Sequence, residues 1–236
     1  MISENLESVL RQLPDGVRLI AVSKLKPVED IHEAYQAGQH LFGENYATEL
    51  RDKYNMLCNP QSLSHPATQP LSDIEWHFIG HLQSKQLKYY IPFVSMIHGV
   101  DSITHLADVD KAASKVGRTV NVLLQVHVAQ EETKFGFSPD ELSSSQIQLS
   151  AFPNVRICGI MGMASHTDDI SRVRTDFHTL RTLFEQLKTN SFASHPEFRE
   201  LSMGMSHDWH IAVDEGSTLI RLGTAIFGPR DYSKKP

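Results

Sequence analysis

Short runs of apolar residues alternate along this chain with longer stretches in which apolar residues recur at helical spacing. The run at residues 19–22 has the length of a buried strand, and Val28, Ile31 and Tyr35 behind it fall on one helix face. The alternation recurs to the end of the chain, and its longest apolar run is at residues 120–128. Strands separated by helices are typical of repeated βα units, so the pattern predicts an α/β fold.

The apolar runs number eight. They predict strands at residues 19–22, 40–42, 75–79, 94–98, 120–128, 155–161, 199–203 and 218–222. Eight such strands favour a closed barrel over an open sheet, and 236 residues is near the usual length of that barrel. We therefore predict a single (β/α)8 TIM-type barrel in one domain over residues 1–236. Residues 58–73 are polar, contain three prolines and show no periodicity, so we expect a flexible surface loop there.

Charge and composition argue against several classes of partner. The net charge of −6 and the pI near 6.1 give no support for nucleic-acid binding, which favours a basic face. No apolar run approaches the roughly 18 residues of a membrane helix, and the N-terminus lacks a signal-peptide pattern. Two cysteines cannot form a disulfide framework. We expect a cytoplasmic protein, and a monomer, since no edge strand or exposed apolar patch is evident.

Lys24 follows the first predicted strand almost directly. Barrel active sites lie at the carboxyl ends of the strands, so this amine would face the mouth of the barrel. Low dielectric there lowers the pKa of a lysine and makes the neutral, nucleophilic amine available. The alternative is a solvated lysine in a loop between strand and helix, and position alone favours that alternative.

A second signal comes from the loops after the last two predicted strands. Barrels often bind phosphate with these loops, and here residues 201–206 and 221–228 supply glycines and hydroxyl groups. The alternative is two ordinary turns, with Ser206 as a helix N-cap. A closed barrel makes the first strand a neighbour of the last, so Lys24 and these loops would face one pocket.

Arg221 interrupts the apolar last strand. A guanidinium in such a strand is costly unless it has a partner, and a carboxylate on a neighbouring element would be the ordinary one.

Two pairs of histidines have a spacing that could bind a metal. His77 with His81, and His207 with His210, have a spacing that suits a helix. His77 falls on a predicted strand, however, and no cysteine or acidic cluster completes either pair. We therefore predict no metal site.

Five segments resemble one protein family, in the family's order and along nearly the whole chain. They are AVSKLKP (21–27), FGENY (42–46), EWHFIGHLQSK (75–85), LSMGMS (201–206) and GSTLIRLGTAIFGPRDY (216–232). They are similar to the pyridoxal phosphate homeostasis proteins of the YggS/PROSC type, which are related to the barrel domain of alanine racemase. The resemblance implies an alanine-racemase N-terminal-domain-like barrel that binds pyridoxal 5′-phosphate (PLP).

The resemblance also implies how PLP is bound. Lys24 would form an internal aldimine with the aldehyde of the cofactor. The phosphate would contact two turns, formed by Ser202, Met203 and Gly204 and by Gly223 and Thr224.

Further residues are implied at the ring and at the mouth of the barrel. Arg221 would lie against the pyridine nitrogen, as in the related alanine racemase barrels. Asn45 and His77 match family positions that line the mouth. Met161 and Met203 would form part of the pocket wall or simply pack in the core.

These implications favour a carrier over an enzyme. An arginine at the pyridine nitrogen keeps that nitrogen unprotonated, which leaves the ring a weak electron sink. Racemases of this barrel class use a tyrosine from a second, β-rich domain, and we expect no such domain here. We predict a role in PLP (vitamin B6) homeostasis and in delivery of PLP to PLP-dependent apo-enzymes, with little or no catalysis.

Other functions fit part of the pattern. One is a small PLP-dependent amino-acid racemase. Another is a Schiff-base aldolase in which Lys24 attacks a phosphosugar, although an aldolase does not explain all five segments. Lys134 follows the fifth predicted strand and matches a family position, so it could accept PLP transiently; the alternative is a salt-bridged loop lysine.

Overall fold

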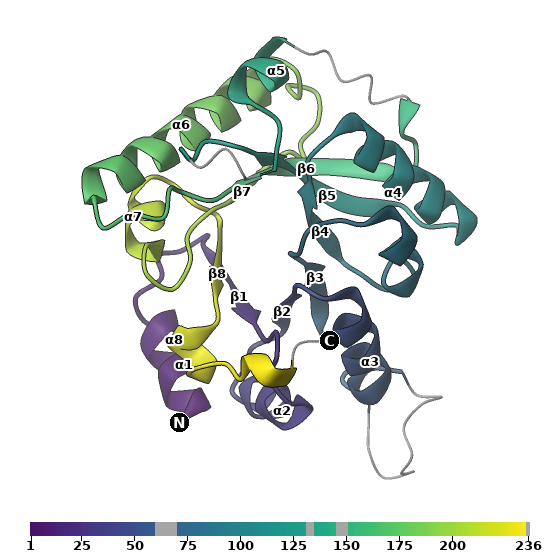
Figure 1. The fold of residues 1–236 in the computed structure, drawn as a ribbon, viewed down its shortest axis with the longest axis vertical. Coiled ribbons are helices and arrows are strands. Elements are labelled where there is room, and N and C mark those ends of the chain that lie inside the picture. The colour runs from purple at the N-terminus through teal and green to yellow at the C-terminus, as the bar shows by residue number, and fades with distance from the viewer. Residues whose placement is uncertain (60–69, 131–134, 145–150, 235–236) are drawn as a thin grey trace.

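Eight parallel strands form a closed barrel in the computed structural model, which describes residues 1–59, 70–130, 135–144 and 151–234. Each strand pairs with the next along the chain, and the last pairs with the first (Figure 1). The strands are β1 (Arg18–Val22), β2 (Leu41–Glu44), β3 (Glu75–Phe78), β4 (Met96–Val100), β5 (Val120–Val126), β6 (Val155–Gly162), β7 (Glu200–Ser202) and β8 (Leu219–Leu222). The predicted (β/α)8 barrel is confirmed.

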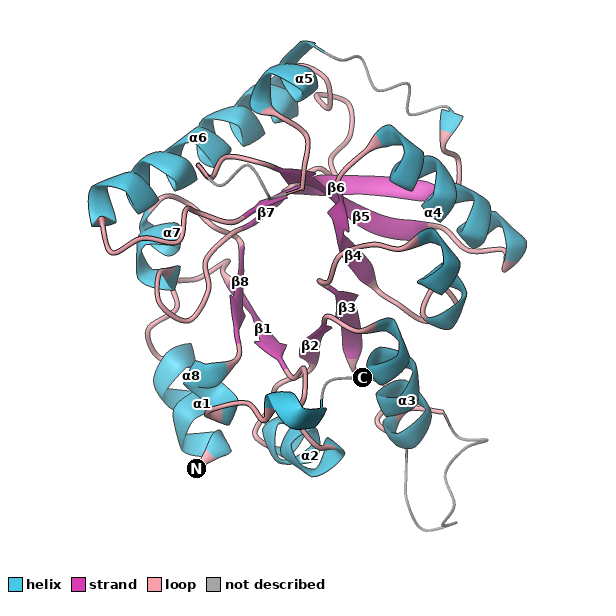
Figure 2. Ribbon diagram, in the orientation of Figure 1, coloured by secondary structure: helices cyan, strands magenta, loops and turns pink. Residues whose placement is uncertain are grey.

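Helices surround this ring of strands (Figure 2). They are α1 (Ile2–Leu10), α2 (Val28–Gln36), α3 (Ala47–Leu57), α4 (Ile103–Lys115), α5 (Pro139–Ser144), α6 (Ile170–Thr189), α7 (Trp209–Asp214) and α8 (Thr224–Phe227), with 3-10 turns η1 (Ser84–Tyr89) and η3 (Tyr232–Lys234). Among the helices described, none has the length and apolar character needed to cross a membrane.

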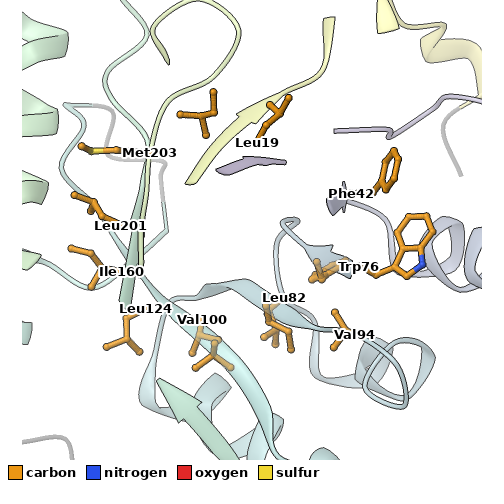
Figure 3. Close-up of a cluster of buried hydrophobic side chains, with 14 of the residues drawn as sticks. Leu19, Phe42, Trp76, Leu82, Val94, Val100, Leu124, Ile160, Leu201 and Met203 are labelled. Carbon is orange, nitrogen blue, oxygen red and sulfur yellow. The ribbon is translucent and has the colours of Figure 1, made fainter. Parts of the chain in front are cut away.

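The strand side chains divide between two apolar clusters. Leu19, Phe42 and Trp76 point outward and pack beneath the helices (Figure 3). Ile20 and Val22 point inward and fill the inside of the barrel. Successive strand residues face opposite sides, and both sides are buried here. For this reason the strands are visible in the sequence as continuous apolar runs.

Close contact between β6 and β7 depends on one glycine. A Cβ added at Gly159 would lie 1.8 Å from the carbonyl oxygen of Glu200, and the φ of Gly159 is +152°. The register between β5 and β6 also shifts at this level, between Val122 and Leu123. A side chain at position 159 would therefore push β7 away from β6.

The observed boundaries differ from the predicted ones by a few residues. β4 begins at Met96, two residues later than predicted, and continues to Val100. β7 contains only three residues. Residues 60–69, most of the loop expected at 58–73, lie outside the described part of the chain. The assignment of the whole chain to one domain stays a prediction.

Candidate functional site

Lys24 lies two residues beyond β1, at the carboxyl end of the barrel strands. The side chain is partly buried and makes no hydrogen bond to a described residue. Burial lowers the pKa of Lys24, and the positive charge of Arg230 lowers it further, while Glu44 and Glu49 act in the opposite direction. A lysine with a lowered pKa supplies a neutral amine more readily than a solvated one.

Side chains of α3 hold the turn that carries Lys24. Leu25 has a φ of +61°, a left-handed conformation that costs a residue with a side chain about 1–2 kcal/mol. The Leu25 amide donates to Glu49 Oε1 at 2.6 Å, and Lys53 Nζ donates to the Ser23 carbonyl oxygen at 2.7 Å. These two contacts offset the cost of the turn, so the backbone around Lys24 is held in one conformation.

Lys53 also joins two acidic side chains behind the turn. Its amine lies 2.8 Å from Glu44 Oε1 and 2.6 Å from Glu49 Oε1. Ser23 Oγ donates to Glu44 Oε1 at 2.6 Å. Burial raises the pKa of Glu44 to about 7, although Lys53 acts to lower it. Two acidic side chains therefore share one buried ammonium group.

The turn after β8 lies beside the turn that carries Lys24. β1 and β8 are paired, with Ala21 opposite Leu222. A Cβ added at Gly223 would lie 3.2 Å from the carbonyl oxygen of Val22, so Gly223 stands close to the end of β1. The predicted meeting of the first and last strands in one place is confirmed.

Ser206 brings the loop after β7 to this same turn. The Gly223 amide donates to Ser206 Oγ at 3.4 Å, and Ser206 Oγ lies 3.3 Å from Thr224 Oγ1. Thr224 is exposed and Ser206 is half-buried. Two hydroxyl groups and a backbone amide thus gather at the start of α8, a donor set that suits an anion.

Arg230 completes this group, and it was not among the predicted site residues. A Cβ added at Gly223 would lie 1.9 Å from Arg230 Nη2, so the guanidinium lies directly over the glycine. Arg230 Nε is buried and has no hydrogen-bond partner. The sequence signal was present in the GPRDY segment, but only the fold brings that segment back to the mouth of the barrel.

Arg221 lies inside the barrel and has no carboxylate partner among the described residues. Its Nη1 donates to Ser202 Oγ at 2.6 Å, and its Nη2 donates to the Gly162 carbonyl oxygen at 3.2 Å. Burial lowers the pKa of Arg221 to about 10, which Asp208 partly opposes from a distance. The ion pair considered as an alternative is therefore absent from this part of the molecule.

His98, which the sequence did not single out, connects Ser202 to His77. His98 Nδ1 lies 3.1 Å from Ser202 Oγ, and His98 Nε2 lies 2.9 Å from His77 Nδ1. All three side chains are buried. His77 lines a cavity of about 760 Å3 at the other end of the barrel, together with Arg18 and Asn121. It therefore does not lie at the mouth, where the sequence placed it.

The structure also separates the side chains of the 202–204 turn from the Gly223 turn. The Ser202 hydroxyl is engaged inside the barrel by Arg221 and His98. Ser202 points inward, and successive side chains along a strand face opposite sides. Met203 accordingly points outward and belongs to the outer apolar cluster. Met203 is therefore a core residue, the alternative considered for it. The Gly204 carbonyl oxygen accepts from the Arg221 amide at 3.0 Å.

Two other predicted residues lie nearer the site. Asn45 follows β2 and borders a cavity of about 390 Å3 with Tyr46 and His81. Its Oδ1 is buried without a hydrogen-bond partner. Met161 faces the inside of the barrel in the inner apolar cluster. Lys134 lies outside the described residues.

This chain is similar to known proteins along nearly its whole length. A family model described as alanine racemase, N-terminal domain, matches residues 1–231. A pyridoxal phosphate homeostasis protein of Bos taurus is 40% identical over 245 residues, covering 99% of this chain and 86% of that protein. The corresponding protein of Pasteurella multocida is 36% identical over 236 residues, covering 99% of this chain and 96% of that protein.

Solved structures agree with these sequence matches. PipY of Synechococcus elongatus, solved without PLP, has a TM-score of 0.84 and 38% identity, covering 97% of this chain and 100% of its own. PipY with PLP bound has a TM-score of 0.81 and 37% identity over the same shares of the two chains.

Proposed function

Because this chain belongs to the alanine racemase N-terminal domain family, and within it to the pyridoxal phosphate homeostasis proteins, we propose that it binds PLP covalently on Lys24. The observation that carries the proposal is the position of one amine. Lys24 makes no hydrogen bond to a described residue, has a lowered pKa, and belongs to the turn beside Gly223.

The donors at the Gly223 turn fit a phosphate ester. Thr224 and Ser206 offer hydroxyl groups, Gly223 offers a backbone amide, and Arg230 offers a positive charge with an unsatisfied Nε–H. Charge-assisted hydrogen bonds of this kind are the strong ones, and arginine suits phosphate because its donors form a fork. We assign the phosphate to these four residues, with Ser206 in the place expected for Ser202.

Arg221 fits the ring of the cofactor. A buried guanidinium without a carboxylate is costly, and an electron-rich ligand would offset that cost. Ser202 and Gly162 satisfy two of its five N–H groups. Asn45 Oδ1, a buried acceptor without a donor, is available after β2, which is separated from β8 only by β1.

Reversible binding is the basis of the proposed physiological role. PLP supplies an aldehyde that forms a reversible Schiff base with a lysine amine. Arg221, as a fixed positive charge, would oppose protonation of the pyridine nitrogen and so disfavour carbanion chemistry. We infer a carrier that stores PLP and gives it up to PLP-dependent apo-enzymes, with little or no catalysis. Cytoplasmic location and a monomeric state stay predictions from the sequence.

The test begins with the absorption spectrum of the purified protein titrated with PLP. Borohydride reduction and peptide mapping by mass spectrometry then locate the attached residue. We expect the adduct on Lys24, and we expect Lys24→Ala to lose both the near-visible band and the adduct. Lys115→Ala, at the exposed end of α4, is the matched control and should behave as the unsubstituted protein. A reducible adduct that persists in Lys24→Ala would overturn the assignment.

The same preparation separates the alternative functions. Interconversion of alanine enantiomers above trace rates, by protein loaded with PLP, would favour a small racemase. Cleavage of a phosphosugar without any PLP band would favour an aldolase. Transfer of PLP to an apo-enzyme faster than release of PLP into buffer is the result expected of a carrier.

A further inference from the structure

A continuous chain of hydrogen bonds crosses the inside of the barrel. It begins at Arg221 Nη1, passes through Ser202 Oγ and the imidazole of His98, and ends on His77 Nδ1, with donor–acceptor distances of 2.6, 3.1 and 2.9 Å. The four side chains come from β8, β7, β4 and β3. The chain therefore connects the side of the barrel proposed to hold PLP with the cavity at the opposite end.

One arrangement of protons uses the donors of Arg221, Ser202 and His98 all within this chain of hydrogen bonds. A guanidinium donates and never accepts, so Ser202 Oγ is the acceptor for Arg221. The Ser202 oxygen has a second lone pair that could accept from His98 Nδ1, but the hydroxyl proton of Ser202 would then have no acceptor among the described residues, so we assign that proton to His98 Nδ1. A neutral His98 with its proton on Nε2 donates to His77 Nδ1, and His77 carries its own proton on Nε2.

The neutral state of both imidazoles agrees with their surroundings. Burial lowers the pKa of His77 to about 3, with a smaller contribution from Arg18. Burial also places the pKa of His98 well below its ordinary value, helped by the charges of Arg221 and Arg18 and by His77. A protonated His98 would place a second cation beside Arg221 and could not accept from Ser202.

We propose that His98, acting through Ser202, is a positioning residue that holds the Arg221 guanidinium toward the cofactor, and that His77 fixes the tautomer of His98. The proposal rests on the proposed function, because Arg221 has its role only if PLP binds. The physical reason is that Arg221 is held by neutral acceptors alone. Its full positive charge then stays available to a ligand, and its direction depends on the orientation of the Ser202 hydroxyl.

Two variants of His98 each remove a different contact of the hydrogen-bond chain, and a third removes both contacts. His98→Asn retains an acceptor near the position of Nδ1, so Ser202 stays oriented. His98→Gln places its amide near the position of Nε2, so the contact with His77 is favoured and the contact with Ser202 is lost. His98→Leu removes both. Unfolding of each variant by urea shows whether it is folded before PLP is added.

PLP titrations followed by absorbance and by the pH dependence of the bound band provide the test. We expect His98→Asn to bind within about threefold of the unsubstituted protein. We expect His98→Gln and His98→Leu to bind about tenfold more weakly, because a misdirected Arg221 would lose one charge-assisted hydrogen bond to the cofactor, with a shifted pH midpoint of the band. Equal affinity and an unchanged band in all three folded variants would overturn the positioning role.

A measurement without ligand checks the proton arrangement itself. Nitrogen-15 NMR of the imidazoles should show both His77 and His98 neutral and protonated on Nε2. A proton on Nδ1 of either ring would contradict the proposed direction of the hydrogen bonds. Failure of the unsubstituted protein to bind PLP would instead overturn the proposed function, and the positioning role with it, so the two failures are distinguishable.

Discussion

The guanidinium of Arg230 covers Gly223 so closely that an added Cβ would lie 1.9 Å from its Nη2. Burial is the largest cause of the lowered pKa of Lys24, and the positive charge of Arg230 is the second largest. One arginine is thus placed to act on both parts of the proposed site. It supplies charge where the phosphate is expected, and it favours the neutral amine where the aldehyde is expected.

Replacement of Arg230 by glutamine should weaken both parts. Without the cation, the pKa of Lys24 rises, so covalent attachment of PLP should need a higher pH. Affinity for PLP should also fall about tenfold, as expected for loss of a charge-assisted hydrogen bond. Stopped-flow absorbance across a pH series measures both effects. Arg230→Lys keeps the charge and should leave the pH midpoint unchanged; an equal shift in both variants would refute the electrostatic explanation.

Gly223→Ala should interfere with phosphate binding by a steric route. The new methyl group would displace Arg230 and would also press on the carbonyl oxygen of Val22 at 3.2 Å. We expect weaker binding of inorganic phosphate and of PLP, measured by calorimetry. In the background of Arg230→Ala the clash with the guanidinium is gone, so the additional effect of Gly223→Ala should be smaller. Additive losses in the double variant would argue against this contact.

Much of the fold could be predicted from the sequence because both faces of each strand are buried. β1 and β5 appear as continuous apolar runs, and α6 as a long helical pattern, so their existence needs no tertiary information. Lys24 was also predictable, since the end of β1 is near the mouth of any such barrel. Strand order then brings Gly223 beside it.

The directions of individual side chains could not be predicted in the same way. Whether Ser202 or Met203 points inward depends on the register of β7 with its neighbours, which the short strand does not reveal. His98 lies in an apolar run, where nothing in the sequence indicates a role. Its role is indicated only by the folded contact with Ser202, which in turn accepts from Arg221. Arg230 lies beyond the last strand, and its position over Gly223 comes from tertiary structure alone.

Lys53→Met should destabilise the protein strongly. It would leave the buried carboxylate of Glu44 and that of Glu49 without their cation, and breaking a buried pair in this way costs about 3–5 kcal/mol. The folded-state pKa of Glu44, about 7, lies above its ordinary value of 4.5, so its contribution to stability falls as pH rises from about 4.5 through 7. Lys53 lowers that pKa, so without Lys53 it rises further and ionised Glu44 costs the variant more than it costs the unsubstituted protein. The loss caused by Lys53→Met should therefore be larger at pH 8 than at pH 5.5.

Urea unfolding of Lys53→Met at these two pH values provides the measurement. Adding Glu44→Gln to Lys53→Met removes the buried charge, so the double variant should recover part of the stability at pH 8. Equal destabilisation at both pH values, with no recovery in the double variant, would show that Lys53 acts through packing alone.

His77→Asn tests the buried neutral imidazole. The pKa of His77 is lowered by burial from 6.5 to about 3, so the unfolded chain binds a proton between these values and the folded protein does not. Stability from this residue is present above pH 6.5 and is lost as pH falls toward 3. Asparagine keeps an acceptor for His98 but cannot be protonated. Relative to the unsubstituted protein, the free energy of unfolding of His77→Asn should therefore rise by about 2 kcal/mol between pH 6 and pH 4. Parallel curves for the two proteins over that range would mean that the folded barrel does not lower the pKa of His77, which would contradict an imidazole held neutral by burial.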